Sequence, residues 1–176
     1  MVAVRAGRRL AWALSLSAAG LGVAGQAPPR PSDTASLVRA LDHSDWTVQQ
    51  PALEALRERA RTEPAALAAL TQALRNRDWR VRQGAAWALG RLGPVAAPAV
   101  PALMDTLKDS DWLVRLGAVQ ALGQLGPTAV AAVGALIQAR TEADPVVRAA
   151  ADTVLKDLAE HVPSARETIE RAIQPK

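Results

Sequence analysis

Residues 78–94 read DWRVRQGAAWALGRLGP, and the pattern of this stretch recurs elsewhere in the chain. Asp-Trp stands at 45–46, 78–79 and 111–112, and Asp-Pro stands at 144–145, so each copy begins 33 residues after the one before it. Other positions keep the same phase, because Val follows each Asp by three residues, Ala by seven and Leu by eleven. A fixed period of this length indicates tandem copies of one supersecondary unit.

The spacing within one copy is helical. The apolar residues that fall on one face of a 3.6-residue helix in residues 78–94 are Val81, Ala85, Ala88, Leu89 and Leu92. Asp78 stands just before this face and can accept backbone N–H bonds as a helix N-cap. Gly93 suits a left-handed C-cap, and Pro94 cannot continue the helix. The same spacing over 67–74 predicts a preceding helix, so each unit is a helix, a tight turn ending in Asp, and a second helix.

Hairpins of this kind bury their apolar faces only by stacking on one another. We therefore expect an all-α fold, an α-solenoid of about four and a half helix-pair repeats that occupies residues 32–176. The predicted units lie near 31–61, 64–93, 97–126 and 130–160, with a capping helix at 163–173. In that last helix, Ile169 and Ile173 continue the apolar columns of the earlier repeats.

Residues 78–94, followed by AVPAL at 99–103, resemble a HEAT repeat, and more closely the bacterial HEAT-like repeats first associated with phycobilisome lyases. The resemblance spans residues 32–173. It implies a right-handed α-solenoid in which the second helix of each unit lines the concave side. It does not select a function, because such arrays serve as scaffolds, adaptors, lyase chaperones and a few enzymes. The first unit departs from the pattern at Gln49 and Pro51, which predicts either a kinked unit or an N-terminal cap.

Composition excludes many kinds of catalytic and metal site. The chain has no Cys, Tyr or Phe and only two His residues, His43 and His161, which are far apart. No sequence signature of a serine hydrolase, zinc protease, phosphate-binding loop or dinucleotide-binding fold is present. We therefore predict a protein that is not an enzyme and that needs neither a metal nor a cofactor.

The N-terminal segment has the layout of an export signal. Residues 1–9 are basic, residues 10–24 are apolar and rich in small side chains, and Pro residues follow at 28–31. We expect residues 1–27 to be a signal peptide or anchor, residues 28–31 to be a linker, and the protein to be periplasmic or extracellular. Membrane contact is expected only if residues 10–24 remain as an uncleaved anchor, and a cytosolic helix is the remaining alternative.

The positive charge of the chain lies mostly in this segment. The net charge is +4 for the whole chain, but it is only +1 without residues 1–27. A domain that binds nucleic acid usually carries a larger excess of basic residues. Charge therefore argues against nucleic acid as the partner.

Two polar columns of the repeat predict a structural ladder between neighbouring units. Its residues are Asp45, Asp78, Asp111, Asp144, Arg82, Arg115 and Arg148. In the family that the chain resembles, such arginines pair with acidic turn residues of neighbouring repeats. The available partners here are Asp109, Asp111, Glu142 and Asp144. The alternative is a row of arginines that binds a ligand.

The tryptophans offer candidate binding residues. Trp46, Trp79 and Trp112 share one column, and each could grip a partner or cover the edge of its own core. Trp87 stands in a variable column with Glu54, Gln120 and Thr153, so the repeat does not require it. We expect it either to line a mildly apolar groove or to fill a gap between helices. The other predicted residues of this groove are Arg80, Gln83, Leu113, Leu116 and Gln120.

The sequence therefore predicts an exported, non-enzymatic interaction or scaffold module that binds another protein or a peptide on its second helices. One alternative, drawn from the resemblance alone, is an accessory protein of a lyase or of a system that handles a cofactor such as a tetrapyrrole. A further alternative is a binder of nucleic acid or another polyanion through Arg75, Arg77, Arg80 and Arg82.

Overall fold

The structure is a computed structural model that describes residues 33–141 and 144–173, all within one compact unit. The predicted signal or anchor segment 1–27 and the predicted linker 28–31 lie outside the described residues. Export and membrane anchoring therefore stay predictions.

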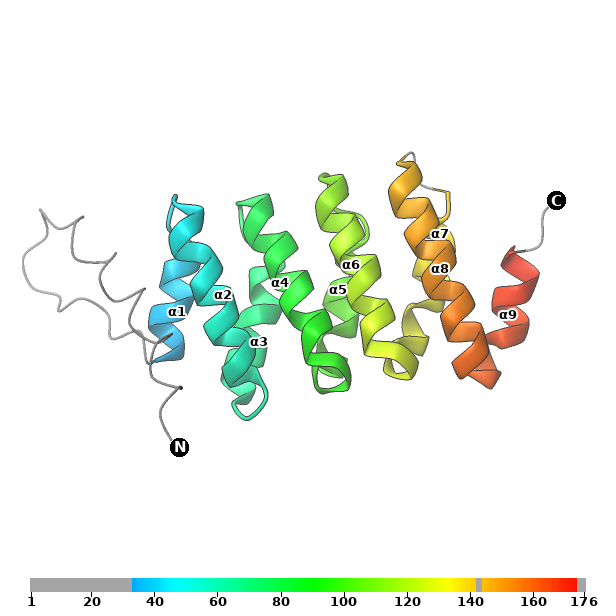
Figure 1. The fold of residues 1–176 in the computed structure, drawn as a ribbon, viewed down its shortest axis with the longest axis horizontal. Coiled ribbons are helices and arrows are strands. Elements are labelled where there is room, and N and C mark those ends of the chain that lie inside the picture. Colours follow the sequence, from blue (N-terminus) through cyan, green and yellow to red (C-terminus); the bar gives the residue numbers. More distant parts are fainter. Residues whose placement is uncertain (1–32, 142–143, 174–176) are drawn as a thin grey trace, which may run out of the picture. The chain divides into compact units, whose positions relative to one another are not determined.

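Helical hairpins follow one another along the described residues, and a single helix ends the series (Figure 1). We call the first helix of each hairpin an A helix and the second a B helix. The A and B helices pair as α1 (Thr34–Leu41) with α2 (Trp46–Ala60), α3 (Pro64–Ala73) with α4 (Trp79–Leu92), α5 (Val100–Thr106) with α6 (Trp112–Leu125), and α7 (Val133–Ala139) with α8 (Pro145–His161). The final helix is α9 (Pro163–Ile173). No strand occurs in residues 33–141 or 144–173.

The hairpins are stacked side by side in two layers. Each B helix packs against its own A helix and against the next B helix, and α9 packs against α7 and α8. Figure 1 shows α2, α4, α6 and α8 as one layer, with the A helices behind them. This arrangement confirms the predicted α-solenoid.

The apolar columns of the repeat form one continuous core. On the B helices, Leu56, Leu89, Leu122 and Leu155 are all completely buried. On the A helices the equivalent column is also buried, and its members are Leu37, Leu70, Leu103, Leu136 and Ile169. Each hairpin buries these leucines only because a neighbour covers them, so stability comes from contacts between adjacent hairpins.

The conserved position of Asp in each copy is explained by helix capping. Asp45, Asp78, Asp111 and Asp144 are the N-caps of the four B helices, and each carboxylate accepts the backbone N–H two residues later at 2.8–2.9 Å. The capping role predicted for Asp78 is therefore confirmed. The carboxylate also lies at the positive end of the helix dipole, which favours its charge.

The glycines that end two B helices adopt backbone angles that other residues avoid. Gly93 has φ 61° and Gly126 has φ 58°, as expected of a glycine C-cap. Their ψ values of −141° and −135° nevertheless lie outside the left-handed helical region that was predicted. The chain then turns directly into short 3₁₀ helices, η2 (Gly93–Ala99) and η3 (Gly126–Ala132).

The first hairpin keeps a continuous B helix despite its proline. Helix α2 runs from Trp46 to Ala60 with Pro51 inside it. Pro51 has no N–H to donate to the carbonyl of Thr47, so one bond of the helical ladder is missing there. Thr47 and Pro51 are both exposed, so water can donate a hydrogen bond to the carbonyl of Thr47 instead.

Candidate functional site

Arg82 ties the turn of its own hairpin to the turn of the next one. Its guanidinium donates to the two carboxylate oxygens of Asp109 at 2.7 and 2.8 Å, and to the carbonyl of Asn76 at 2.9 Å. The hydrogen bonds to Asp109 raise the pKa of Arg82. Burial alone would raise the pKa of Asp109, but the bonds from Arg82 and from the Asp111 N–H outweigh burial and lower it. Both side chains are mostly buried, so this pair has a structural place in the stack.

Arg115 repeats part of this arrangement one hairpin later. Its Nη1 donates to the carbonyls of Asp109 and Ser110 at 2.8 and 3.2 Å, as Arg82 does in its own turn. Glu142, one of its predicted partners, lies outside the described residues. Arg148 occupies the equivalent position on α8.

In the first hairpin an amide takes the place of the guanidinium. Gln49 is almost completely buried, and its Nε2 donates to the carbonyl of His43 at 2.5 Å and to Asp78 Oδ2 at 3.3 Å. Gln49 therefore links its own turn to the next hairpin, as Arg82 does. The acceptor differs, because Gln49 donates to Asp78, the N-cap of α4, whereas Arg82 donates to Asp109, whose equivalent in the second hairpin is Asn76.

Three of the four arginines in the cluster at the second turn pair with carboxylates, and the exposed Arg77 is the fourth. Arg75 lies 3.5 Å from Asp105, Arg80 lies 2.7 Å from Asp78, and Arg82 pairs with Asp109. The hydrogen bond from Arg80, opposed by burial, is the main reason why the pKa of Asp78 falls to about 2. These pairings leave little free positive charge for phosphates, which argues against a polyanion site at this turn.

The tryptophan column begins the B helices. Trp46, Trp79 and Trp112 are the first residues of α2, α4 and α6, whose equivalent ends lie along one edge of the stack (Figure 1). Trp46 is half-buried against the core, whereas Trp79 is 38% exposed and Trp112 is 41% exposed. The column is therefore uniform in position but not in burial.

A hollow of about 250 Å³ lies between α2 and α4 on the B-helix layer. Its lining residues are Trp46, Gln50, Leu53 and Glu54 from α2, and Gln83, Gly84 and Trp87 from α4. We call this feature the α2–α4 hollow. A Cβ at position 84 would lie 2.5 Å from Leu53 Cδ1 and 3.4 Å from Trp46 Cη2. The absence of a side chain at Gly84 therefore leaves room for Leu53 and Trp46 at the base of the hollow.

The charged groups beside the α2–α4 hollow are already paired. The Arg91 guanidinium carbon lies 5.5 Å from the centre of the Trp87 ring. Arg57 donates to Glu54 at 3.0 Å and also contacts Glu58 at 2.5 Å. Nearby acids and bases thus compensate one another.

The α2–α4 hollow brings together only some of the predicted binding residues. Trp46, Gln83 and Trp87 line it, and Trp87 is 44% exposed instead of filling a gap between helices. Six predicted residues do not line it. Arg80 instead pairs with Asp78. The others are Trp79 at the start of α4, Trp112 at the start of α6, and Leu113, Leu116 and Gln120 within α6.

Sequence reasoning missed four residues of the hollow, Gln50, Leu53, Glu54 and Gly84. A signal in the sequence points to Gly84 alone. Its column holds Gly84, Gly117 and Ala150 in successive hairpins, and such small residues at one position of a stack indicate close approach of neighbouring helices.

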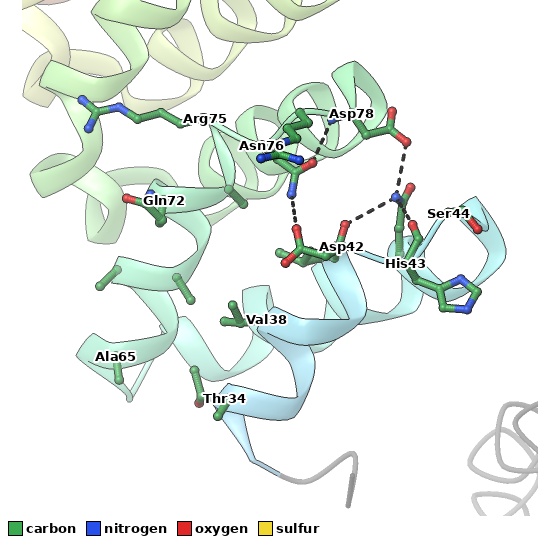
Figure 2. Close-up of a pocket in the computed structure, with 17 residues that line it drawn as sticks. Thr34, Val38, Asp42, His43, Ser44, Ala65, Gln72, Arg75, Asn76 and Asp78 are labelled. Atoms are coloured by element: carbon green, nitrogen blue, oxygen red, sulfur yellow. Dashed lines mark hydrogen bonds between the residues drawn. The ribbon is translucent and has the colours of Figure 1, made fainter. Parts of the chain in front are cut away.

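A second, larger cleft opens on the other layer, between α1 and α3 (Figure 2). It measures about 1270 Å³, and small residues of both helices line much of it, among them Ala35, Val38, Ala65 and Ala68. Its polar end holds Asp42, which accepts a hydrogen bond from Asn76 at 3.0 Å. No sequence feature predicted this cleft.

The described histidines have local roles. His43 Nδ1 accepts the N–H of Asp45 at 3.0 Å, and His161 Nδ1 lies 2.8 Å from the carbonyl oxygen of Asp157 at the exposed end of α8. In the part of the chain that the structure describes, no three His, Cys, Asp or Glu side chains gather in a way that could hold a metal ion.

Comparison with known proteins identifies the repeat. The family described as HEAT repeats matches residues 34–100 and 96–156, which is more than half of the chain. No curated protein sequence matches this chain significantly.

Two solved structures, an engineered protein and a designed armadillo repeat protein, share the fold. An engineered protein is 24% identical, with a TM-score of 0.60 over 80% of this chain and 69% of that one. A designed armadillo repeat protein in complex with the peptide (KR)4 is 20% identical, with a TM-score of 0.61 over 81% and 71% of the two chains. The complex of CpcE and CpcF of phycocyanin lyase from Nostoc sp. PCC7120 gives 22% identity and a TM-score of 0.48 over 84% and 71%.

Proposed function

Because this chain belongs to the HEAT-repeat family, we propose that it is a non-enzymatic interaction module that binds a protein or peptide on its B helices. The observation that carries the proposal is the exposure of Trp87 in the α2–α4 hollow. The partner would place one of its side chains in this hollow and would extend along the surfaces of α2 and α4 beside it.

Trp87 is costly to expose and is not required by the fold. The equivalent positions in the other hairpins hold Glu54, Gln120 and Thr153, so the stack forms with polar residues there. A large indole at such a position supports a binding role, because tryptophan is enriched among the residues that dominate binding energy at protein interfaces. The ring can bury a large apolar area at the cost of ordering few side-chain torsions.

The hollow needs little rearrangement to accept a partner. Its residues come from two packed helices, and Leu53 at its base is buried. A rigid surface pays a smaller entropic cost on binding than a loop that must become ordered. The helical frame therefore supports a binding site formed in advance.

A library of random peptides displayed on phage and selected on the full chain tests the proposal. We expect the selected peptides to lose capture by the variant Trp87→Ala and to keep capture by Trp112→Ala. Trp112 is the matched control, because it is exposed to nearly the same extent on a neighbouring B helix but does not line the hollow. Circular dichroism checks that both variants keep the helical fold. The proposal fails if the selected peptides bind Trp87→Ala as strongly as the unmodified chain.

A further inference from the structure

We infer that the α2–α4 hollow recognises an uncharged, proline-containing segment in an extended conformation. This inference rests on the proposed function and names the class of peptide that the same site would take. Three properties of the hollow carry it: the balance of charge at its edge, the aromatic and apolar walls, and the unused hydrogen-bond donors.

Charge at the hollow does not select a charged ligand. Glu54 is the only charged residue among the lining residues, and it already accepts a hydrogen bond from Arg57. Arg91 already lies over the Trp87 ring, so a cation from a ligand would meet like charge at that ring. A cationic side chain would have to displace one of these arginines, whereas an uncharged segment leaves both pairs intact.

The size and walls of the hollow suit a compact apolar group. At about 250 Å³ it is smaller than the pockets of about 300–1,000 Å³ that hold drug-sized molecules or cofactors. Two indoles, from Trp46 and Trp87, and the Leu53 side chain supply its apolar surface. Grooves lined by aromatic rings bind proline-rich segments, because the compact apolar proline ring packs on an indole and the extended helix of such segments is formed before binding.

The polar groups of the hollow match the backbone of such a segment. Among the described residues, no hydrogen bond engages the side-chain amides of Gln50 and Gln83 or the indole N–H groups of Trp46 and Trp87. These four side chains can all donate. A proline residue has a carbonyl but no N–H, so a proline-rich backbone offers acceptors almost exclusively. Donors that line the hollow therefore complement it.

Isothermal titration calorimetry of the full chain with octaproline tests the inference. Two further octapeptides serve as comparisons, one alternating glycine and serine, and one alternating lysine and arginine. We expect octaproline to bind more tightly than either comparison peptide. We also expect Trp87→Ala to weaken octaproline binding at least about tenfold, while Trp112→Ala changes it by less than about twofold.

Raising the salt concentration separates recognition of an uncharged segment from recognition of a cation. It should leave octaproline binding unchanged, because that peptide has no side-chain charge, whereas binding of a cationic peptide beside Glu54 would weaken. If the lysine–arginine peptide binds in a Trp87-dependent way and octaproline does not, the inference is wrong and the proposed function stands. Equal binding of octaproline to Trp87→Ala, or no octaproline binding at all, also overturns the inference. Only the selection from the displayed library decides the proposed function itself.

Discussion

Replacing Gly90 with alanine probes the packing of α4 against α6, on which the stack depends. A Cβ at position 90 would lie 2.9 Å from Ala121 Cα and 3.0 Å from Gln124 Oε1. The first of these atoms belongs to the backbone of α6, so one of the two helices must shift to admit a methyl group. Gly117, in the middle of α6, is the matched control, because its added Cβ would meet Ala86 Cβ at an ordinary 3.5 Å.

Both substitutions gain stability from the higher helix propensity of alanine, but only one of them loses stability through crowding between helices. Alanine inside a helix is favoured over glycine by about 1 kcal/mol in both variants. Forcing an extra methyl group into a packed interface costs about 1–3 kcal/mol, and only Gly90→Ala incurs this cost. We therefore expect Gly117→Ala to raise the free energy of unfolding, and Gly90→Ala to lie about 1–3 kcal/mol below it.

Urea denaturation followed by circular dichroism measures both free energies of unfolding. The slope of the transition checks that neither variant changes the surface exposed on unfolding. If Gly90→Ala proves as stabilising as Gly117→Ala, then α4 and α6 do not approach as closely as the structure describes.

Two further predictions concern the core and the helix caps. We expect Leu89→Ala, at a completely buried central position, to lower the free energy of unfolding by about 2–5 kcal/mol in the same urea titration. Ile173 is half-buried in the final helix, so Ile173→Ala should lower it by less. Equal losses would contradict a stack stabilised by neighbours on both sides. The pKa of Asp78 falls to about 2 in the folded chain and is about 3.9 in an unfolded one, so its stabilisation is complete above about pH 5 and is lost as the pH falls toward 2. Asp78→Asn should therefore lose less stability than the unmodified chain between pH 5 and pH 2, and identical acid dependence would show that the capping carboxylate is not held in its charged form.

Much of the fold was predictable because the same residue types recur at the same positions of every repeat. A column of identical residues, such as Leu89 and its equivalents, marks the core without any knowledge of the packing. The capping role of Asp78 followed from its place before an apolar helical face. These features are local or strictly periodic, and each hairpin shows them again in its own residues.

The site was less predictable because it depends on differences between hairpins. Trp87 was found because it departs from its column, but its neighbours in the hollow lie on α2, whereas the prediction looked toward α6. The direction depends on Gly84, whose missing side chain lets Leu53 and Trp46 of α2 pack closely against α4. The cleft between α1 and α3 depends on the separation of two helices, which no residue pattern in the sequence encodes.

The ladder shows how a departure from the repeat can preserve its role. Gln49 breaks the arginine column, and the sequence therefore suggested a kinked or capping unit. In the structure its amide still bridges to the next hairpin, through the carboxylate of Asp78 at the start of α4. This bridge is visible only once the contact between neighbouring turns is known.

The most direct test of the account follows the indole N–H signals of the full chain by nuclear magnetic resonance as a peptide selected from the displayed library is added. Binding in the α2–α4 hollow predicts that the signals of Trp46 and Trp87 shift, while those of Trp79 and Trp112 stay in place. Shifts confined to Trp79 and Trp112 would place the partner on the turn edge and would contradict the account.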